Sequence, residues 1–188
     1  MAYLALFIAL GIFLAIAGWQ LAVWLVETRD KNSKYRAATA CAKKSGKQLL
    51  IAGGPWGVTK TRRRLNKPAH GSGDVCLDID RRALGDHPRG VVASVTHIPF
   101  SDKCFGAAFA SHLLEHLPTV ADGKQALEEL NRVAEAVFIV SPSRQSFSGW
   151  LTRGHHLWVW QKGSLTYFKQ RGKARGKDFL AVDSSAKG

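Results

Sequence analysis

"VTHIPFSDKCFGAAFASHLLEHLP", residues 95–118, holds the pattern that decides the fold of this chain. The segment begins as a strand, breaks at a turn, continues as a second apolar strand and ends in His112, Glu115 and His116 at helical spacing. Short apolar strands of this kind are typical of a parallel sheet that is covered on both faces. In such a sheet, ligands bind beyond the carboxyl ends of the strands.

Short apolar runs recur along the chain after residue 47. Their branched and small residues predict five strands, at 48–52, 74–79, 90–95, 105–110 and 136–141. Before the last of these, "ADGKQALEELNRVAEA" (121–136) places apolar residues on one face and charges on the other, which predicts an amphipathic helix. Strands that alternate with helices predict one α/β domain over residues 48–182, with a mostly parallel sheet and flanking helices.

The N-terminus is apolar. The first 26 residues contain no Asp, Glu, Lys or Arg. As a helix they would reach about 39 Å, which exceeds the hydrocarbon core of a bilayer at about 30 Å. A cleaved signal peptide is the alternative, but it favours basic residues before a shorter apolar run that ends in small residues. This run ends in Trp24, Leu25 and Val26, so we expect residues 1–26 to form a transmembrane anchor.

The segment after the predicted anchor is basic. Residues 27–47 carry seven Lys or Arg side chains against Glu27 and Asp30, and we expect a juxtamembrane linker with some helical character. The chain would be a single-pass protein, and Lys and Arg are enriched on the cytoplasmic flank of membrane spans. Its C-terminal domain would lie on the cytoplasmic side.

The formal net charge of +13 comes from beyond the anchor. It gathers in residues 27–47 and in two further runs, "KTRRRLNK" (60–67) and "KQRGKARGK" (169–177). Nucleic acid could bind such a surface, but the anionic headgroups beside a tethered domain attract the same side chains. The membrane surface is therefore the expected partner, and nucleic acid is the less economical interpretation.

Four small residues lie on one face of the predicted anchor. Gly11, Ala15, Gly18 and Ala22 follow helical spacing, which lets another transmembrane helix approach closely. The pattern predicts other transmembrane subunits as partners. The alternative is that glycine and alanine are simply common in membrane helices.

The three cysteines argue against a cross-linked fold. Cys41, Cys76 and Cys104 form no close pair, so their spacing matches neither a zinc site nor a disulfide framework. We expect reduced and mostly buried thiols.

A glycine turn and a carboxylate follow the first two predicted strands. In "AGGPWG" (52–57), Gly53, Gly54 and Gly57 let the backbone turn sharply and approach a ligand, although turns use glycine in any case. Asp78 follows about 20 residues later, where a carboxylate can accept hydrogen bonds from a ribose diol. The alternative for Asp78 is a helix cap, but Asp80 fits that cap better.

Four motifs in this order resemble the class I S-adenosylmethionine-dependent methyltransferases. They are "QLLIAGGPWG" (48–57), "DVCLDID" (74–80), "ASVTHIPFSDKCFGAAFASHLLEHLP" (93–118) and "ALEELNRVAEAVFIVSPS" (126–143). Their order and spacing are most similar to the small-molecule branch that includes the ubiquinone and menaquinone biosynthetic enzymes. The resemblance covers residues 48–160, and its most specific part ends in "HLLEHLP".

The resemblance implies a Rossmann-like sheet and S-adenosylmethionine as the cofactor. The glycine turn would hold the methionine part of the cofactor, and Asp78 would hold the ribose hydroxyls. Further contacts would follow the third and fourth strands, with Ser94, Val95 and Thr96 beside the adenine and with Ser111, His112 and Glu115 near the methyl group.

Methyl transfer from a sulfonium depends mostly on alignment of the nucleophile with the methyl carbon. A general base is needed only for a protonated nucleophile, and His112 and His116 are the candidates. Their alternative role is to cap the helix or line the pocket. The two histidines could also suggest zinc, but the HExxH order is absent, so we expect no metal.

Several positions depart from the family pattern. Pro55 stands at the middle glycine of the turn, and Ile51 replaces the acid near the end of the first strand. Ser94 replaces the acid after the third strand, and Gly106 replaces the aspartate of the fourth. These losses predict weaker cofactor binding, because one charge-assisted hydrogen bond contributes about 1.5 to 3 kcal/mol. The alternative function is therefore a degenerate methyltransferase fold that serves as a structural subunit of a membrane complex.

The segment after the fifth strand is aromatic and basic. Trp150, Trp158 and Trp160 alternate with Arg144 and Arg153. This surface could rest on the bilayer interface and admit a lipophilic acceptor, or it could simply cover the core. "SLTYFKQRGKARGKDFLAV" (164–182) predicts a hairpin, and residues 183–188 a flexible tail. The leading prediction is a membrane-anchored methyltransferase-like protein that acts on a lipophilic small molecule.

Overall fold

The computed structural model describes residues 2–55, 71–85, 87–172 and 179–183. Gly57, the basic run 60–67 and the predicted tail after Asp183 lie outside these residues, as does most of the basic turn of the predicted hairpin.

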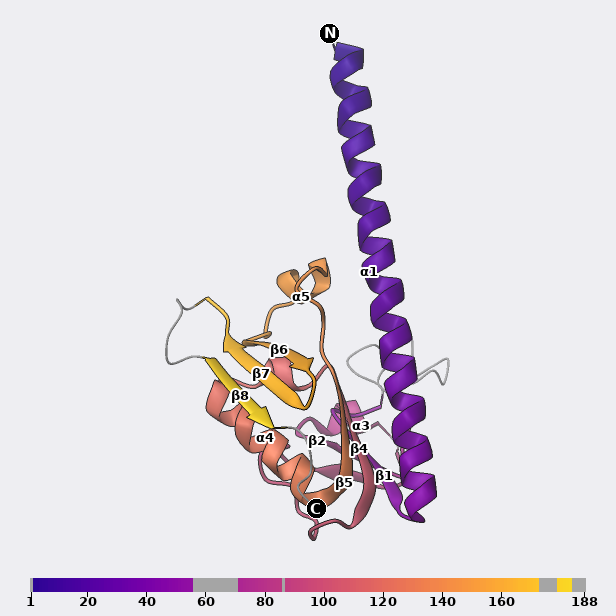
Figure 1. The fold of residues 1–188 in the computed structure, drawn as a ribbon, viewed down its shortest axis with the longest axis vertical. Helices are drawn as coiled ribbons and strands as arrows, with labels where there is room; N and C mark the ends of the chain where they lie inside the picture. Colours follow the sequence, from indigo (N-terminus) through magenta and orange to yellow (C-terminus); the bar gives the residue numbers. More distant parts are fainter. Residues whose placement is uncertain (1, 56–70, 86, 173–178, 184–188) are drawn as a thin grey trace.

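The larger sheet has five parallel strands, as the apolar runs predicted (Figure 1). Its order is β3-β2-β1-β4-β5, so the order reverses between β1 and β4. The fold is therefore Rossmann-like. The strands are β1 (Gln48–Ala52), β2 (Val75–Asp78), β3 (Gly90–Val92), β4 (Phe105–Ser111) and β5 (Ala134–Val140).

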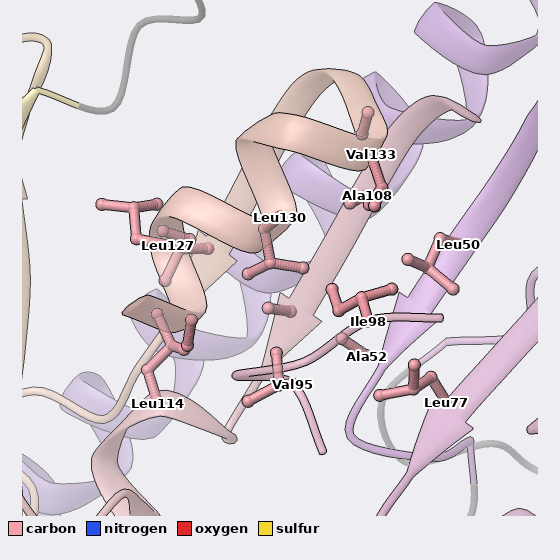
Figure 2. Packing of buried hydrophobic residues seen from close by; sticks show 14 of the residues in the cluster. Leu50, Ala52, Leu77, Val95, Ile98, Ala108, Leu114, Leu127, Leu130 and Val133 are labelled. Carbon is pink, nitrogen blue, oxygen red and sulfur yellow. The ribbon is translucent and has the colours of Figure 1, made fainter. Parts of the chain in front are cut away.

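The two faces of the sheet are buried under different elements. Leu50 and Ala108 face the helix α4 (Val120–Val133) and pack against its Leu127 and Leu130 (Figure 2). Since successive side chains of a strand point to opposite faces, their neighbours face the other way into a second core. That core contains Leu49, Ile51, Ala107, Phe109, Ala38 and Ala42.

The second core depends on α1 (Ala2–Ser45), which is one continuous helix. Residues 27–47 were expected to form a linker, but α1 reaches Ser45 and buries Ala38 and Ala42 against the sheet. Side chains of α1 also bind the end of β5 and the loop that follows it: Lys34 Nζ donates to the carbonyl of Ile139 at 3.0 Å, and Glu27 accepts from the amide of Ser143 at 2.7 Å. This segment is therefore part of the domain.

Gly106 lies where α1 crosses β4. A Cβ at this position would lie 2.0 Å from Ser45 Oγ and 2.8 Å from Ala42 Cα. The packing of α1 explains why glycine stands where the family pattern has an aspartate, because a side chain here would push the helix off the sheet.

The N-terminal half of α1 projects away from the domain (Figure 1). It is long and apolar enough to cross a membrane, and only 6% of its most apolar window is buried. This criterion rests on length and composition, which core helices and signal sequences also satisfy. The exposed apolar surface does exclude a role for residues 3–21 in the core of the domain.

The sequence predicted a helix for the polar cluster of His112, Glu115 and His116, and the structure differs. β4 continues to Ser111, His112 adopts a positive φ of 53°, and a 3-10 turn, η1 (Leu114–His116), follows. The helix α4 begins at Val120, where Thr119 and Asp122 form a capping box, and it ends at Val133, one residue before β5. The short helix α3 (Arg81–Leu84) is capped by Asp80, as predicted.

A second sheet is antiparallel, with the order β6-β7-β8. The predicted hairpin is confirmed, since β7 (Leu165–Gln170) pairs with β8 (Phe179–Asp183). The strand β6 (Leu157–Lys162) was not predicted, and a short helix, α5 (Phe147–Leu151), precedes it. The sheet packs on α4, where Phe168 leaves room only for glycine at position 123.

Candidate functional site

A cavity of about 370 Å³ lies at the carboxyl ends of β1 and β2 and beside the loop after β3. Small-molecule sites commonly have volumes of about 300 to 1,000 Å³. The cavity is lined by Gly53, Leu77, Asp78, Ile79, Ala93, Ser94, Val95, Thr96, Leu113, His116, Leu117, Pro118 and Asp122. It thus unites six of the eleven site residues that the sequence predicted.

Gly53 forms the corner after β1. Its φ of 103° favours glycine, and an added Cβ would lie 3.3 Å from the Cβ of Leu113. The amides of Gly53 and Gly54 both donate to the carbonyl of Leu77, at 2.9 and 3.3 Å, which ties the turn to the end of β2. The backbone therefore borders the cavity without a side chain between it and a ligand.

Gly54 has a different reason for being glycine. A Cβ there would lie 2.7 Å from the carbonyl oxygen of Ala83, so Gly54 packs against α3. Gly54 is not among the residues that line the cavity. Pro55 follows it and is buried.

Asp78 closes β2 and faces the cavity. Its Oδ1 accepts from the amide of Asp80 at 2.7 Å. Burial raises the pKa of Asp78, and the backbone amides of Asp80 and Ile79 offset part of this rise. Asp80 caps α3, so Asp78 is not needed for that cap.

Ser94, Val95 and Thr96 form the opposite wall of the cavity. The hydroxyls of Ser94 and Thr96 lie 2.8 Å apart, and the amide of Thr96 donates to Ser94 Oγ at 3.2 Å. Gln125 of α4 holds the segment through the carbonyl of Thr96 at 3.0 Å. A flat ring beside this wall would meet two backbone turns and the apolar side chains of Leu77 and Ala93.

Arg132 holds the loop that continues from this wall, a role the sequence analysis did not find. Its guanidinium binds Glu129 twice, at 2.7 and 2.8 Å, and donates to the carbonyls of Ile98 and Phe100. It also pairs with Asp102 at 2.8 Å. Both carboxylates raise the pKa of Arg132 further above its usual range, and Arg132 in turn lowers the pKa of Glu129.

The two predicted catalytic histidines separate. His116 lines the cavity, whereas His112 and Ser111 do not. The hydroxyl of Ser111 is buried without a hydrogen-bond partner among the described residues. His112 Nδ1 lies 3.3 Å from Oε1 of Glu115, whose side chain is 1% exposed.

His155 joins this cluster from the loop before β6, and the sequence analysis did not single it out. Its ring lies edge-on to the ring of His116, with 4.6 Å between the centroids. Burial lowers the pKa of His155, although the carbonyl of Gly149 and the carboxylate of Glu115 act in the opposite direction. The only signal in the sequence is the pair His155 and His156, which lies outside the resembling motifs.

A larger cavity of about 550 Å³ lies between α1 and the ends of β5 and β6. Asp30 and Lys34 of α1, Arg144 and Trp160 belong to its wall, and none of the predicted site residues does. The smaller cavity lies beyond the carboxyl ends of β1 and β2, where ligands bind in sheets of this kind.

The sequence profile of the family described as "Methyltransferase domain" matches residues 67–136, which is less than half of the chain. The match includes Asp78, Ser94–Thr96 and His116. No curated protein matches the chain. The match and the sheet order together support a class I S-adenosylmethionine-dependent methyltransferase fold.

Several solved structures are similar. A methyltransferase from Clostridium acetobutylicum is 10% identical over 72% of this chain, with a TM-score of 0.41. A protein from Pyrococcus horikoshii is 15% identical, covers 82% of this chain and 75% of its own, and has a TM-score of 0.42. The amino pentose methyltransferase of calicheamicin biosynthesis from Micromonospora echinaspora, solved with S-adenosylmethionine, is 18% identical over 97% of this chain and 80% of its own, with a TM-score of 0.41.

These similarities are distant. The chain spans 63% of the length of the Clostridium protein, which is less than two thirds. They carry no argument about substrate or activity.

Proposed function

We propose that this chain is a membrane-anchored, S-adenosylmethionine-dependent methyltransferase that acts on a lipophilic small molecule. The observation that carries the proposal is the cavity in which the Gly53 corner, the Asp78 carboxylate and the Ser94–Thr96 wall meet. The carboxylate suits a ribose diol, and the open glycine backbone suits the methionine part of the cofactor.

His116 is the general base in this proposal. Of the two histidines, it is the one that lines the cavity, so it can reach a nucleophile aligned with the methyl group. His112 instead faces Glu115, which fits a supporting role.

Ile51 limits how the cofactor is held. Its side chain is fully buried in the core between the sheet and α1 and packs against Gly73. It therefore provides no hydrogen-bond acceptor for the cofactor. The amino group of the cofactor must therefore bind other acceptors, and we expect modest affinity.

The position of α5 supports membrane attachment. Gln20 of α1 accepts from the amide of Phe147 and donates to the carbonyl of Gln145, both at 2.9 Å. Gln20 lies seven residues before Glu27, which is about 10 Å along the helix axis toward the N-terminus of α1. The two hydrogen bonds therefore hold α5 beside this more N-terminal part of α1. Phe147, Trp150 and Leu151 are 52%, 57% and 78% exposed there, as expected for side chains that lie at the bilayer interface.

The same geometry favours a lipophilic acceptor. His116 stacks edge-on against His155, and His155 Nδ1 lies 3.2 Å from the carbonyl of Gly149 in α5. An acceptor that leaves the bilayer beside α5 would therefore reach the histidine end of the cavity. A quinone or an isoprenoid lipid, as in the branch that the sequence resembles, has the required chemistry. The basic flank of α1 supports a cytoplasmic domain in this proposal, because Lys and Arg are enriched on the cytoplasmic flank of membrane spans.

One observation favours the alternative, a structural subunit. Gly11 and Gly18 of α1 have open space around the position of a Cβ, so a partner helix could pack closely on that face. In that case the cavity would hold no cofactor.

The test is transfer of a tritiated methyl group. The full chain in lipid nanodiscs is incubated with S-adenosyl-[methyl-³H]methionine and a membrane lipid extract, and tritium is counted in the organic phase. We expect transfer with the wild type and none with His116→Gln. If the wild type transfers no methyl group to extracts of its native membrane, the result would support the role as a structural subunit.

A further inference from the structure

Glu115, His116 and His155 form a cluster of ligand-type side chains at the rim of the cofactor cavity. One ligand atom from each of the three lies within 4.8 Å of the others. Glu115 and His116 belong to η1, whereas His155 comes from the loop between α5 and β6. The fold therefore brings together residues that lie about 40 positions apart in the sequence, and His155 lies outside the motifs that contain Glu115 and His116.

The carboxylate of Glu115 is the unusual member of this cluster. Its side chain is 1% exposed, and Oε1 accepts no hydrogen bond from the described residues. The ring nitrogen Nδ1 of His112 lies 3.3 Å from it, a distance that meets the limit for an ion pair without hydrogen-bond geometry. The other oxygen accepts from Ser141 Oγ at 3.3 Å. A buried charge held this weakly is costly unless a cation binds it.

Both histidines have a backbone carbonyl beside Nδ1. Nδ1 of His116 lies 3.1 Å from the carbonyl of Gly154, and Nδ1 of His155 lies 3.2 Å from the carbonyl of Gly149. A backbone carbonyl beside Nδ1 fixes the proton there and leaves Nε2 free to bind. Metal-binding histidines usually have such a partner on the second ring nitrogen.

We propose that Glu115, His116 and His155 bind a divalent transition-metal ion of the zinc type. Two imidazoles and one carboxylate suit such an ion, and sites with three protein ligands keep a fourth position open. Tetrahedral ligands at bond lengths of about 2.0 to 2.1 Å lie roughly 3.4 Å apart. Ligand atoms that lie within 4.8 Å of one another would therefore approach by up to about 1.4 Å around the ion.

The site would face the cofactor cavity. Because His116 belongs to the cluster and also lines the cavity, a bound ion would lie beside the cavity. A zinc-type ion lowers the pKa of a bound hydroxyl group. Metal binding itself rests on the cluster alone and does not depend on methyl transfer. If both proposals hold, His116 is a metal ligand and not the general base, the ion would lower the pKa of the acceptor hydroxyl, and the acceptor is a molecule that carries such an oxygen.

The experiment measures metal binding without any methyl donor. The full chain is purified in detergent without a polyhistidine tag, stripped with chelator and titrated with Zn²⁺ in a calorimeter, and the bound metal is counted after dialysis. We expect one equivalent per chain. We expect Glu115→Gln and His155→Gln to weaken binding by more than about 100-fold, since loss of even an outer partner weakens metal binding about 10- to 100-fold.

His156→Gln is the matched control, because His156 is the exposed neighbour of His155 and lies outside the cluster. It should bind one equivalent with wild-type affinity. Thermal unfolding of each variant shows whether the variant is folded. A Co²⁺ absorption spectrum of the wild type reports tetrahedral nitrogen and oxygen ligands, and this measurement does not depend on whether a variant folds. A wild type that retains no Zn²⁺, or folded Glu115→Gln and His155→Gln variants that bind like the wild type, would overturn the metal site. Loss of S-adenosylmethionine binding with intact Zn²⁺ binding would instead count against the proposed function alone.

Discussion

Replacement of Asp78 by Asn separates cofactor binding from stability. In the wild type, Oδ1 accepts from the amide of Asp80, and the proposed function assigns Oδ2 to the ribose. Asn keeps Oδ1 for Asp80 but replaces the second acceptor with an uncharged donor. One charge-assisted hydrogen bond is lost, which costs about 1.5 to 3 kcal/mol. The dissociation constant for S-adenosylhomocysteine should therefore rise roughly 10- to 150-fold.

The stability of the ligand-free protein should change in the opposite direction. Because burial raises the pKa of Asp78, the folded state binds its proton more tightly than the unfolded state does. Ionised Asp78 therefore costs stability, and this cost grows as the pH rises from the ordinary aspartate pKa of about 3.9 through the raised value. Asp78→Asn should unfold at a higher temperature than the wild type at neutral pH, and the difference should vanish below about pH 3.9.

Calorimetric titration and thermal unfolding of the full chain in detergent check both effects. Asp80→Asn is the control, since Asn also caps helices and Asp80 does not line the cavity. It should bind the ligand with nearly wild-type affinity. Unchanged affinity in Asp78→Asn, or equal losses in both variants, would refute the assigned role of Asp78.

Three further predictions concern the fold and the membrane. Gly106→Ala should lower the free energy of unfolding by about 1 to 3 kcal/mol in denaturant titrations, because its Cβ would meet Ala42 of α1. An unchanged denaturation midpoint would contradict the packing of α1 on β4. A fluorescent probe on Leu151→Cys should be quenched by nitroxide-bearing lipids in nanodiscs, and the same probe on exposed Cys104 should not; equal quenching would contradict the interfacial position of α5. Cys104 should react with a thiol reagent at pH 8 long before Cys76, since burial raises the pKa of the Cys76 thiol to about 11; equal rates in the native state would refute the buried strand β2.

The sequence predicted the larger sheet well because its strands carry their own signal. Strands buried on both faces must be short, continuous and apolar, and β1 has the predicted bounds. The strand β6 was missed, because Trp158 and Trp160 in a basic context also suit a surface loop. Its pairing with β7 is a long-range property that no local pattern records.

The role of residues 27–47 was hidden by composition. The segment is rich in Lys, so its average character is that of a linker, but Ala38 and Ala42, with Tyr35 and Cys41, pack one face of the helix onto the sheet. Gly106 carried the complementary signal. It was interpreted as a lost functional residue, whereas the structure shows it as the contact that admits α1.

The site was predicted only where it follows strand ends. Asp78 is the last residue of β2, and Ser94–Thr96 follow β3 closely, so the position of each along the chain fixes its position in space. The positive φ of His112 turns the chain and breaks the expected helical spacing, which separates His112 from His116. His155 reaches the site through the second sheet, and sequence spacing contains no information about that approach.

Photolabelling tests the central claim that the smaller cavity binds S-adenosylmethionine. The full chain in nanodiscs is irradiated with the tritiated cofactor, with and without excess S-adenosylhomocysteine, and the labelled peptides are sequenced. We predict saturable label on the segments that contain Asp78 or Ser94–Thr96, and its loss under competition. Label confined to the cavity beside Asp30 and Lys34, or no saturable label at millimolar cofactor, would contradict the account.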